Sequence, residues 1–244
     1  MKNNLELNEE TRGRVLKYIE EGKKFFANNQ VDKAFNKFNE ALQLNSNYAD
    51  AYLAKCEAYI ELFEFDKAKE CIKKYLRISA DTYRAYLNMI EIYTTSGDFN
   101  KALTFCDKLI TQKPDDCLVY YKKAYILQQL NKIAEAIDCY SKCIELQPEY
   151  YEAYCDKAEL LVSLCSHTEA IELYSRAIAI NKNNPDAYIG KAIAYMDLQD
   201  YPSALPLAKK AYDLNPSDEW CKCYFSIIKD MMKNKNLPNL RVIK

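Results

Sequence analysis

The chain has 244 residues, of which 49% are hydrophobic and 28% charged, a composition that is typical of a folded globular protein and excludes a disordered one. Its 34 basic and 35 acidic residues give a formal net charge of -1, so we expect no global attraction to nucleic acid or to anionic membranes. With only 4 glycines and 1 histidine, the sequence contains no glycine-rich phosphate loop and no two-histidine metalloprotease motif.

The first ten residues, MKNNLELNEE, contain no apolar run, and no stretch of the chain reaches 18 apolar residues. We therefore expect neither a signal peptide nor a membrane-spanning segment. The 10 cysteines are then expected to be reduced thiols rather than a disulfide framework. These features predict a cytoplasmic protein in a reducing compartment, with a ciliary or organelle-associated location as the alternative.

A strict period of 34 residues dominates the sequence. Six tyrosines follow it, at positions 18, 52, 86, 120, 154 and 188, and six alanines follow it, at positions 34, 68, 102, 136, 170 and 204. The period divides most of the chain into six units without an insertion: 15–48, 49–82, 83–116, 117–150, 151–184 and 185–218. Self-similarity at such a period is the signature of a repeat architecture.

Each unit predicts two helices, A and B. Apolar residues at unit positions 4, 8 and 11, and then at 17, 20, 24 and 27, follow the spacing of amphipathic helices. Polar segments such as SGD at 96–98 separate the two helices, and segments such as KPDD at 113–116 separate the units. The alanine at position 20 and the small residue that is usual at position 8 predict a close crossing of helices A and B.

The segments outside the six units have predictions of their own. Residues 1–14 are an N-terminal extension, in which Asn8 or Thr11 caps an extended first helix. Residues 219–232 predict a helix that caps the sixth unit, in which Trp220 is a packing residue rather than a ligand anchor. Residues 233–244 predict a basic, mobile C-terminal tail, with a docking peptide as the alternative.

The pattern resembles the tetratricopeptide repeat (TPR) family. The resemblance rests on the 34-residue period, the aromatic residue at position 4, the small residue at position 8, the alanine at position 20, and Pro114, Pro148 and Pro216 at position 32. Lysine at position 7 of four units, where the family often has leucine, is a departure. The resemblance implies an all-α fold, the right-handed α–α superhelix of antiparallel helix pairs that is called a TPR solenoid.

In this family helices A line a concave groove, through positions 2, 5, 6, 9, 12 and 13 of each unit. In this chain those positions hold ten acidic residues and three basic ones, so the compensating positive charge is expected on the outer face and the tail. The resemblance therefore implies an acidic groove with an apolar and aromatic floor, which suits a basic or amphipathic segment of a protein partner. The residues expected to contact the partner are Leu53, Glu57, Leu87, Glu91, Tyr121, Tyr125, Asp156, Glu159, Ile189 and Ile193.

The acidic C-terminus of a heat-shock chaperone is not an expected partner. The family's clamp for that peptide uses Lys at position 5 and Asn at position 9 of one unit, where the first unit has Ile19 and Lys23. The next unit needs Asn at position 6 and has Ala54, and the third needs a basic residue there and has Asn88. An acidic peptide would also meet the acidic side chains of the groove.

No catalytic, metal or cofactor site is predicted. Cys165 and His167 could act as nucleophile and base, but they lie two residues apart in one turn, which favours a structural histidine. Cys139 and Cys143 lie four residues apart on a predicted helix, and buried structural thiols are expected there rather than a zinc site. We expect the chain not to be an enzyme.

These observations predict a non-catalytic protein–protein interaction scaffold or adaptor, with Tyr121 and Tyr125 as the main anchors for the partner. A structural subunit of a large assembly, such as a ciliary or organellar complex, is the alternative. Single-stranded RNA binding is a weaker alternative because an acidic groove opposes it. We expect neither nucleic acid nor membrane among the partners.

Overall fold

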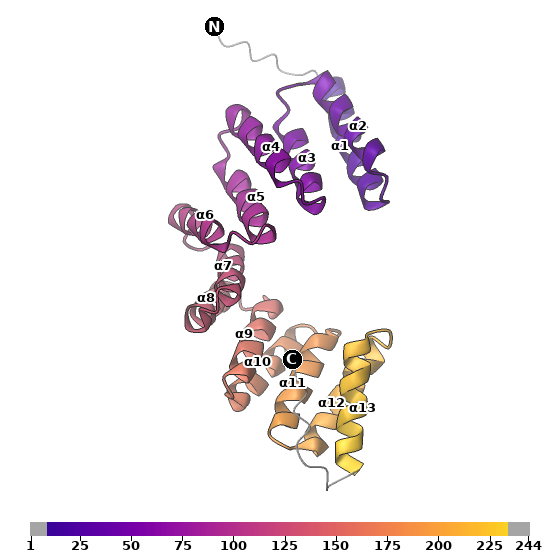
Figure 1. Ribbon diagram of the computed structural model, residues 1–244, viewed down its shortest axis with the longest axis vertical. Helices are drawn as coiled ribbons and strands as arrows, with labels where there is room; N and C mark the ends of the chain where they lie inside the picture. The colour runs from indigo at the N-terminus through magenta and orange to yellow at the C-terminus, as the bar shows by residue number, and fades with distance from the viewer. Residues whose placement is uncertain (1–8, 234–244) are drawn as a thin grey trace. The chain divides into compact units, whose positions relative to one another are not determined.

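The computed structural model describes residues 9–233. These residues form thirteen α-helices and no strand (Figure 1), which confirms the predicted all-α fold. Residues 1–8 and 234–244 lie outside the described residues, and with them the predicted cap at Asn8 and all of the predicted tail except Lys233. The helices are α1 (Glu9–Ala27), α2 (Val31–Leu44), α3 (Ala49–Glu61), α4 (Phe65–Ile78), α5 (Thr82–Thr95), α6 (Phe99–Gln112), α7 (Cys117–Gln129), α8 (Ile133–Leu146), α9 (Tyr151–Ser163), α10 (His167–Ile180), α11 (Pro185–Asp197), α12 (Tyr201–Leu214) and α13 (Glu219–Lys233).

The chain divides into two compact units, which we call unit 1 and unit 2 and which each contain the helix pairs of three 34-residue repeats. Unit 1, Met1–Pro114, contains the helix pairs α1/α2, α3/α4 and α5/α6. Unit 2, Asp115–Lys244, contains the pairs α7/α8, α9/α10 and α11/α12, followed by the single helix α13. We call the first helix of each pair helix A and the second helix B. A short turn joins the two, so helix B runs back along helix A (Figure 1).

Small buried residues let helices A and B approach closely. All six alanines of the 34-residue column are fully buried. At Gly22 in α1, a Cβ atom would lie 2.4 Å from the ring of Phe38 in α2. Any larger side chain at this position would have to displace a buried ring, so this contact is the close crossing that the small residues predict.

Each helix A ends in a turn that contains one residue with a positive φ. These residues are Asn29, Phe63, Gly97, Asn131, Cys165 and Gln199. In the first pair, the N–H of Asn29 donates to the carbonyl of Phe26, and the N–H of Gln30 donates to that of Phe25, both at 2.9 Å. This pattern is a Schellman motif, which satisfies carbonyls at the helix end and reverses the chain so that helix B can begin at once.

Side-chain caps start several of the helices. The carboxylate of Asp116 accepts a hydrogen bond from the N–H of Leu118 at the start of α7, and the amide oxygen of Asn184 accepts one from Asp186 at the start of α11. Asp81, Asp98 and Asp200 cap α5, α6 and α12 in the same way. Each cap satisfies a backbone N–H that the helix itself leaves without a partner.

The last helix, α13, packs against α12. Its buried side chains are Cys221 and Ile228, with Tyr224 and Phe225 partly buried between them. Trp220 has an exposed fraction of 53%, although its ring centroid lies 4.7 Å from that of Tyr224. Trp220 is predicted to be a packing residue, but it packs only partly. The face of α13 that contacts α12 carries the next residue, Cys221, instead.

Candidate functional site

The ten residues expected to contact a partner lie on helices A of both units. Four of them are in unit 1, on α3 and α5, and six are in unit 2, on α7, α9 and α11. Helices A of neighbouring pairs are in contact at α1/α3, α3/α5 and α9/α11, and a side-chain hydrogen bond links α7 to α9. We call the surface that α7, α9 and α11 form the helix-A face of unit 2.

In unit 1, two of the acidic side chains at the groove positions of helices A form ion pairs with basic side chains. Lys23 Nζ in α1 donates to Glu57 Oε2 in α3 at 2.9 Å. Arg84 in α5 donates through Nη1 to Asp50 Oδ1 in α3 at 2.5 Å. Leu53 is fully buried, so it supports this surface without offering contact area. The negative charge of unit 1 available to a partner is therefore smaller than the sequence indicates.

In unit 2, the central feature of the helix-A face is a hydrogen bond between α7 and α9. The hydroxyl of Tyr121 donates to Oδ2 of Asp156 at 2.7 Å. The ring of Tyr121 packs on those of Tyr140 and Tyr150, at centroid distances of 5.7 and 5.0 Å. Sequence reasoning did not assign Tyr140 and Tyr150 to this site, because Tyr140 belongs to a helix B and Tyr150 to a turn. Their only signal was their type, within a tyrosine-rich chain.

The carboxylate of Asp156 is partly desolvated. Burial raises its pKa above the usual value of 3.8, and the nearby charges of Glu159 and Glu152 raise it further. Hydrogen bonds from the hydroxyls of Tyr121 and Tyr140 act in the opposite direction. Among the described residues, no lysine or arginine forms an ion pair with any of these three carboxylates. The site therefore holds negative charge that hydroxyl groups stabilise and no cation neutralises.

The aromatic and apolar side chains beside these acids differ in their exposure to solvent. The side chain of Tyr125, one turn after Tyr121 on α7, has an exposed fraction of 44%. Glu159 occupies the equivalent position of α9 and is also exposed. On α11, Ile193 is partly exposed, whereas Ile189 is buried. The accessible part of the site consists of Tyr125, Glu159 and Ile193, with Tyr121 and Asp156 partly buried behind it.

The residues considered for catalysis are arranged differently. Cys165 is the exposed positive-φ residue of the turn before α10, and His167 is the first residue of that helix. Nδ1 of His167 lies 3.9 Å from Oδ2 of Asp197, and no hydrogen-bond partner reaches it. Within residues 9–233, no group of three or more His, Cys, Asp or Glu side chains is placed to hold a metal ion. No helix in the same range has the length and apolar content that crossing a membrane requires.

Comparison with protein families identifies the repeat. Models described as tetratricopeptide repeat match residues 25–86 and 117–150, and a model described as TPR repeat matches residues 166–199. Together with the helix pairs, these matches decide the assignment. The chain belongs to the tetratricopeptide repeat family. None of the curated protein sequences that were compared with this TPR chain matches it.

Solved structures share the fold of this TPR chain. Yeast Tom70 superposes with a TM-score of 0.78 and 21% identity, over 92% of this chain and 49% of its own, so the chain spans about half the length of Tom70. PilF of Pseudomonas aeruginosa superposes with a TM-score of 0.69 and 16% identity, over 91% of this chain and 99% of its own. YrrB, described as a TPR protein with an unusual peptide-binding site, superposes with a TM-score of 0.57 and 18% identity, over 76% of this chain and 96% of its own.

Proposed function

We propose that this TPR chain is a non-catalytic scaffold or adaptor, and that the helix-A face of unit 2 binds a basic, amphipathic segment of a protein partner. TPR proteins bind protein partners, and the peptide-binding site described for YrrB supports a peptide as the kind of ligand. The observation that carries the proposal is the exposed ring of Tyr125 beside carboxylates that no cation neutralises.

The charge of the site favours a basic ligand. A lysine or arginine side chain placed near Asp156 and Glu159 would neutralise carboxylates that are otherwise in mutual repulsion. Because Asp156 is partly buried, such a contact would be screened less by salt than one on an open surface. The same cation could also lie against the face of an exposed tyrosine ring, which adds a cation–π attraction.

Tyr125 and Tyr121 have different roles in this proposal. Tyr125 is exposed and offers its ring to the apolar side of the ligand. Tyr121 holds the Asp156 carboxylate through its hydroxyl and is packed between two other tyrosine rings. We therefore assign the energetic anchor to Tyr125 and a positioning role to Tyr121.

Fluorescence anisotropy with a labelled, lysine- and leucine-containing amphipathic peptide of about 15 residues tests the proposal. We expect Tyr125→Ala to weaken binding about tenfold and Glu159→Gln to weaken it by a smaller factor. Trp220→Ala and Glu172→Gln are the matched controls, because both residues are exposed and lie outside the helix-A face. Affinity should also fall as the salt concentration rises.

Two results would contradict the proposal. One is an unchanged affinity in Tyr125→Ala, and the other is binding that does not respond to salt. Retention of single-stranded poly(U) RNA by the chain at moderate salt, without binding of the peptide, would favour the nucleic-acid alternative instead.

A further inference from the structure

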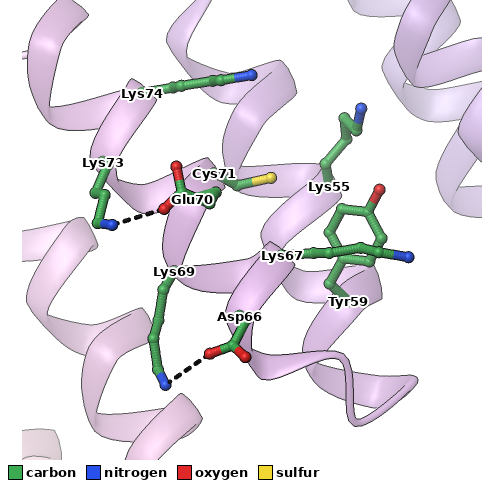
Figure 2. A pocket seen from close by; sticks show the side chains of 9 residues that line it. All are labelled: Lys55, Tyr59, Asp66, Lys67, Lys69, Glu70, Cys71, Lys73 and Lys74. Carbon is green, nitrogen blue, oxygen red and sulfur yellow. Dashed lines mark hydrogen bonds and ion pairs between the residues drawn. The ribbon is translucent and has the colours of Figure 1, made fainter.

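A second surface, on the α3/α4 pair of unit 1, has the opposite charge. A hollow of about 460 Å³ lies between these two helices (Figure 2). Five of its nine lining residues are lysines. The lining residues are Lys55, Tyr59, Asp66, Lys67, Lys69, Glu70, Cys71, Lys73 and Lys74. We call this feature the lysine hollow.

The positive charge of the lysine hollow comes mainly from α4. This helix carries five basic and two acidic residues, a difference of +3. Among the other helices B, α6 and α12 have a difference of +1, and α2, α8 and α10 are neutral or negative. Among the helices B, the positive charge is therefore concentrated on α4.

Three lysines of the hollow already have carboxylate partners. Nζ of Lys73 lies 2.6 Å from Oε1 of Glu70, and Nζ of Lys69 lies 3.3 Å from Oδ1 of Asp66. Lys67 pairs with Glu64, one residue before α4. These three lysines are therefore each paired with a carboxylate of α4 or of the residue before it, and the hollow has two further lysines.

Lys55 and Lys74 have no ion pair with a carboxylate in the described part of the chain. Nζ of Lys55 donates to the side-chain oxygen of Asn39 in α2 at 2.9 Å, and Nζ of Lys74 lies 5.8 Å from the centre of the Tyr52 ring. Both lysines lie near the thiol of Cys71, which Figure 2 shows between them. Two ammonium groups without a counterion thus share one hollow.

Lys55 is the less exposed of the two lysines, so its ammonium group is less well solvated. Its side chain is partly buried, and this burial, reinforced by the positive charge of Lys74, lowers its pKa below the usual value of 10.5. Cys71 acts in the opposite direction and offsets only part of this lowering of the Lys55 pKa, while burial raises the pKa of the Cys71 thiol itself. An anion between Lys55 and Lys74 would supply the missing negative charge.

We propose that the lysine hollow docks an acidic segment, rich in Asp and Glu, of a protein partner. This inference goes beyond the proposed function, since it concerns another surface and a ligand of the opposite charge. Carboxylates of the segment contact Lys55 and Lys74, and its carbon chain lies against the ring of Tyr59 and the lysine stems.

The arrangement of the lysines favours an acidic peptide over other anions. The ammonium groups come from two helices and spread along the hollow, which matches single charges repeated along a chain rather than one phosphate held by converging donors. An excess of three positive charges is also small compared with the six to ten phosphate contacts of a typical nucleic-acid complex.

Fluorescence anisotropy with the full chain and a labelled peptide of alternating Asp and Glu residues tests this inference. We expect the wild-type chain to bind the peptide and Lys55→Gln with Lys74→Gln to weaken binding about fivefold or more. Lys209→Gln with Lys210→Gln is the matched control, because it removes the same charge from two exposed lysines on α12 and should change affinity less than twofold. Circular dichroism checks that each variant is folded.

Each other outcome would count against the inference. Absence of acidic-peptide binding by the wild-type chain, or equal losses in the two double variants, would overturn it. Binding of a phosphoserine peptide that contains no Asp or Glu, or of poly(U) RNA, in preference to the acidic peptide would also overturn it. If the double variant does not fold, the single variant Lys74→Gln provides the test, because Lys74 is exposed. An unchanged affinity of this variant for the acidic peptide would refute the contact between Lys74 and the segment. The basic amphipathic peptide should bind this variant as it binds the wild type, which separates the two proposals.

Discussion

Asp156 belongs to the proposed site, and its partly buried charge lowers the stability of the fold. Burial is the main cause of its raised pKa, and the hydroxyls of two tyrosines only partly offset it. A carboxyl group whose pKa is higher in the folded state than in the unfolded state binds its proton more tightly on folding. Ionised Asp156 therefore destabilises the fold at neutral pH, and this destabilisation disappears as the pH falls through the raised pKa.

We expect Asp156→Asn to raise the melting temperature at pH 7, because the amide removes the buried charge and its oxygen can still accept from the hydroxyl of Tyr121. The difference from the wild type should shrink as the pH is lowered toward 4. Thermal melts followed by circular dichroism at both pH values check this, with the exposed Glu172→Gln as control. A lower melting temperature at pH 7 would mean that the tyrosine hydrogen bonds outweigh the burial of the charge.

The backbone conformation of the A-to-B turns does not depend on the presence of glycine. The chain has only 4 glycines, yet every A-to-B turn has one residue with positive φ. Only Gly97 is a glycine; Phe63 and Cys165 adopt the same conformation at φ 59° and 60°. The hydrogen bonds of the Schellman turn impose this geometry on whichever residue occupies it, so residue type alone could not reveal it.

At the scale of elements, helix packing depends on two close approaches. Gly22 lies against Phe38 within the α1/α2 pair, and Gly190 of α11 lies against Tyr174 of α10, where a Cβ atom would be 2.4 Å from the ring. The first contact follows from the repeat pattern, because Gly22 occupies the small-residue position 8. The second joins neighbouring pairs, and the repeat pattern does not indicate it, because position 6 varies from one 34-residue repeat to the next.

Gly22→Ala should therefore destabilise the chain by about 1–3 kcal/mol, because the buried ring of Phe38 would have to shift. Gly13→Ala, in the same helix but with nothing within 4 Å of the new Cβ, should instead stabilise it by up to about 1 kcal/mol. Urea unfolding of the two variants measures both effects. Similar free energies of unfolding for the two variants would refute the close crossing.

At the scale of the whole molecule, the division into two compact units is the main new feature. Unit 2 contains three helix pairs and α13, which covers α12. Unit 1 contains three pairs and no single helix after its last pair. In repeat proteins each pair is stabilised by its neighbours and a terminal helix closes the apolar end, so the two units should differ in stability when separated.

We expect residues 115–244, produced alone, to be helical and to unfold cooperatively, and to bind the basic amphipathic peptide with an affinity within about threefold of the full chain. Residues 1–114 should be helical but less stable, because the outer side of the α5/α6 pair has no covering helix within unit 1. Circular dichroism, urea unfolding and anisotropy test both fragments. A fragment 115–244 that is unfolded, or folded without binding, would contradict the proposed location of the site.

The sequence by itself determined the family, the all-α fold and the pairing of helices, because the period of 34 residues repeats a local pattern of apolar and polar positions in every pair. It also indicated which helix faces are acidic. Only the tertiary structure decided which of those acids remain without a cation. Glu57 and Asp50 are paired with basic residues of neighbouring helices A, whereas Asp156 meets tyrosine hydroxyls. The partners of these side chains are 34 or 35 residues away along the chain, so their contacts depend on how neighbouring pairs pack.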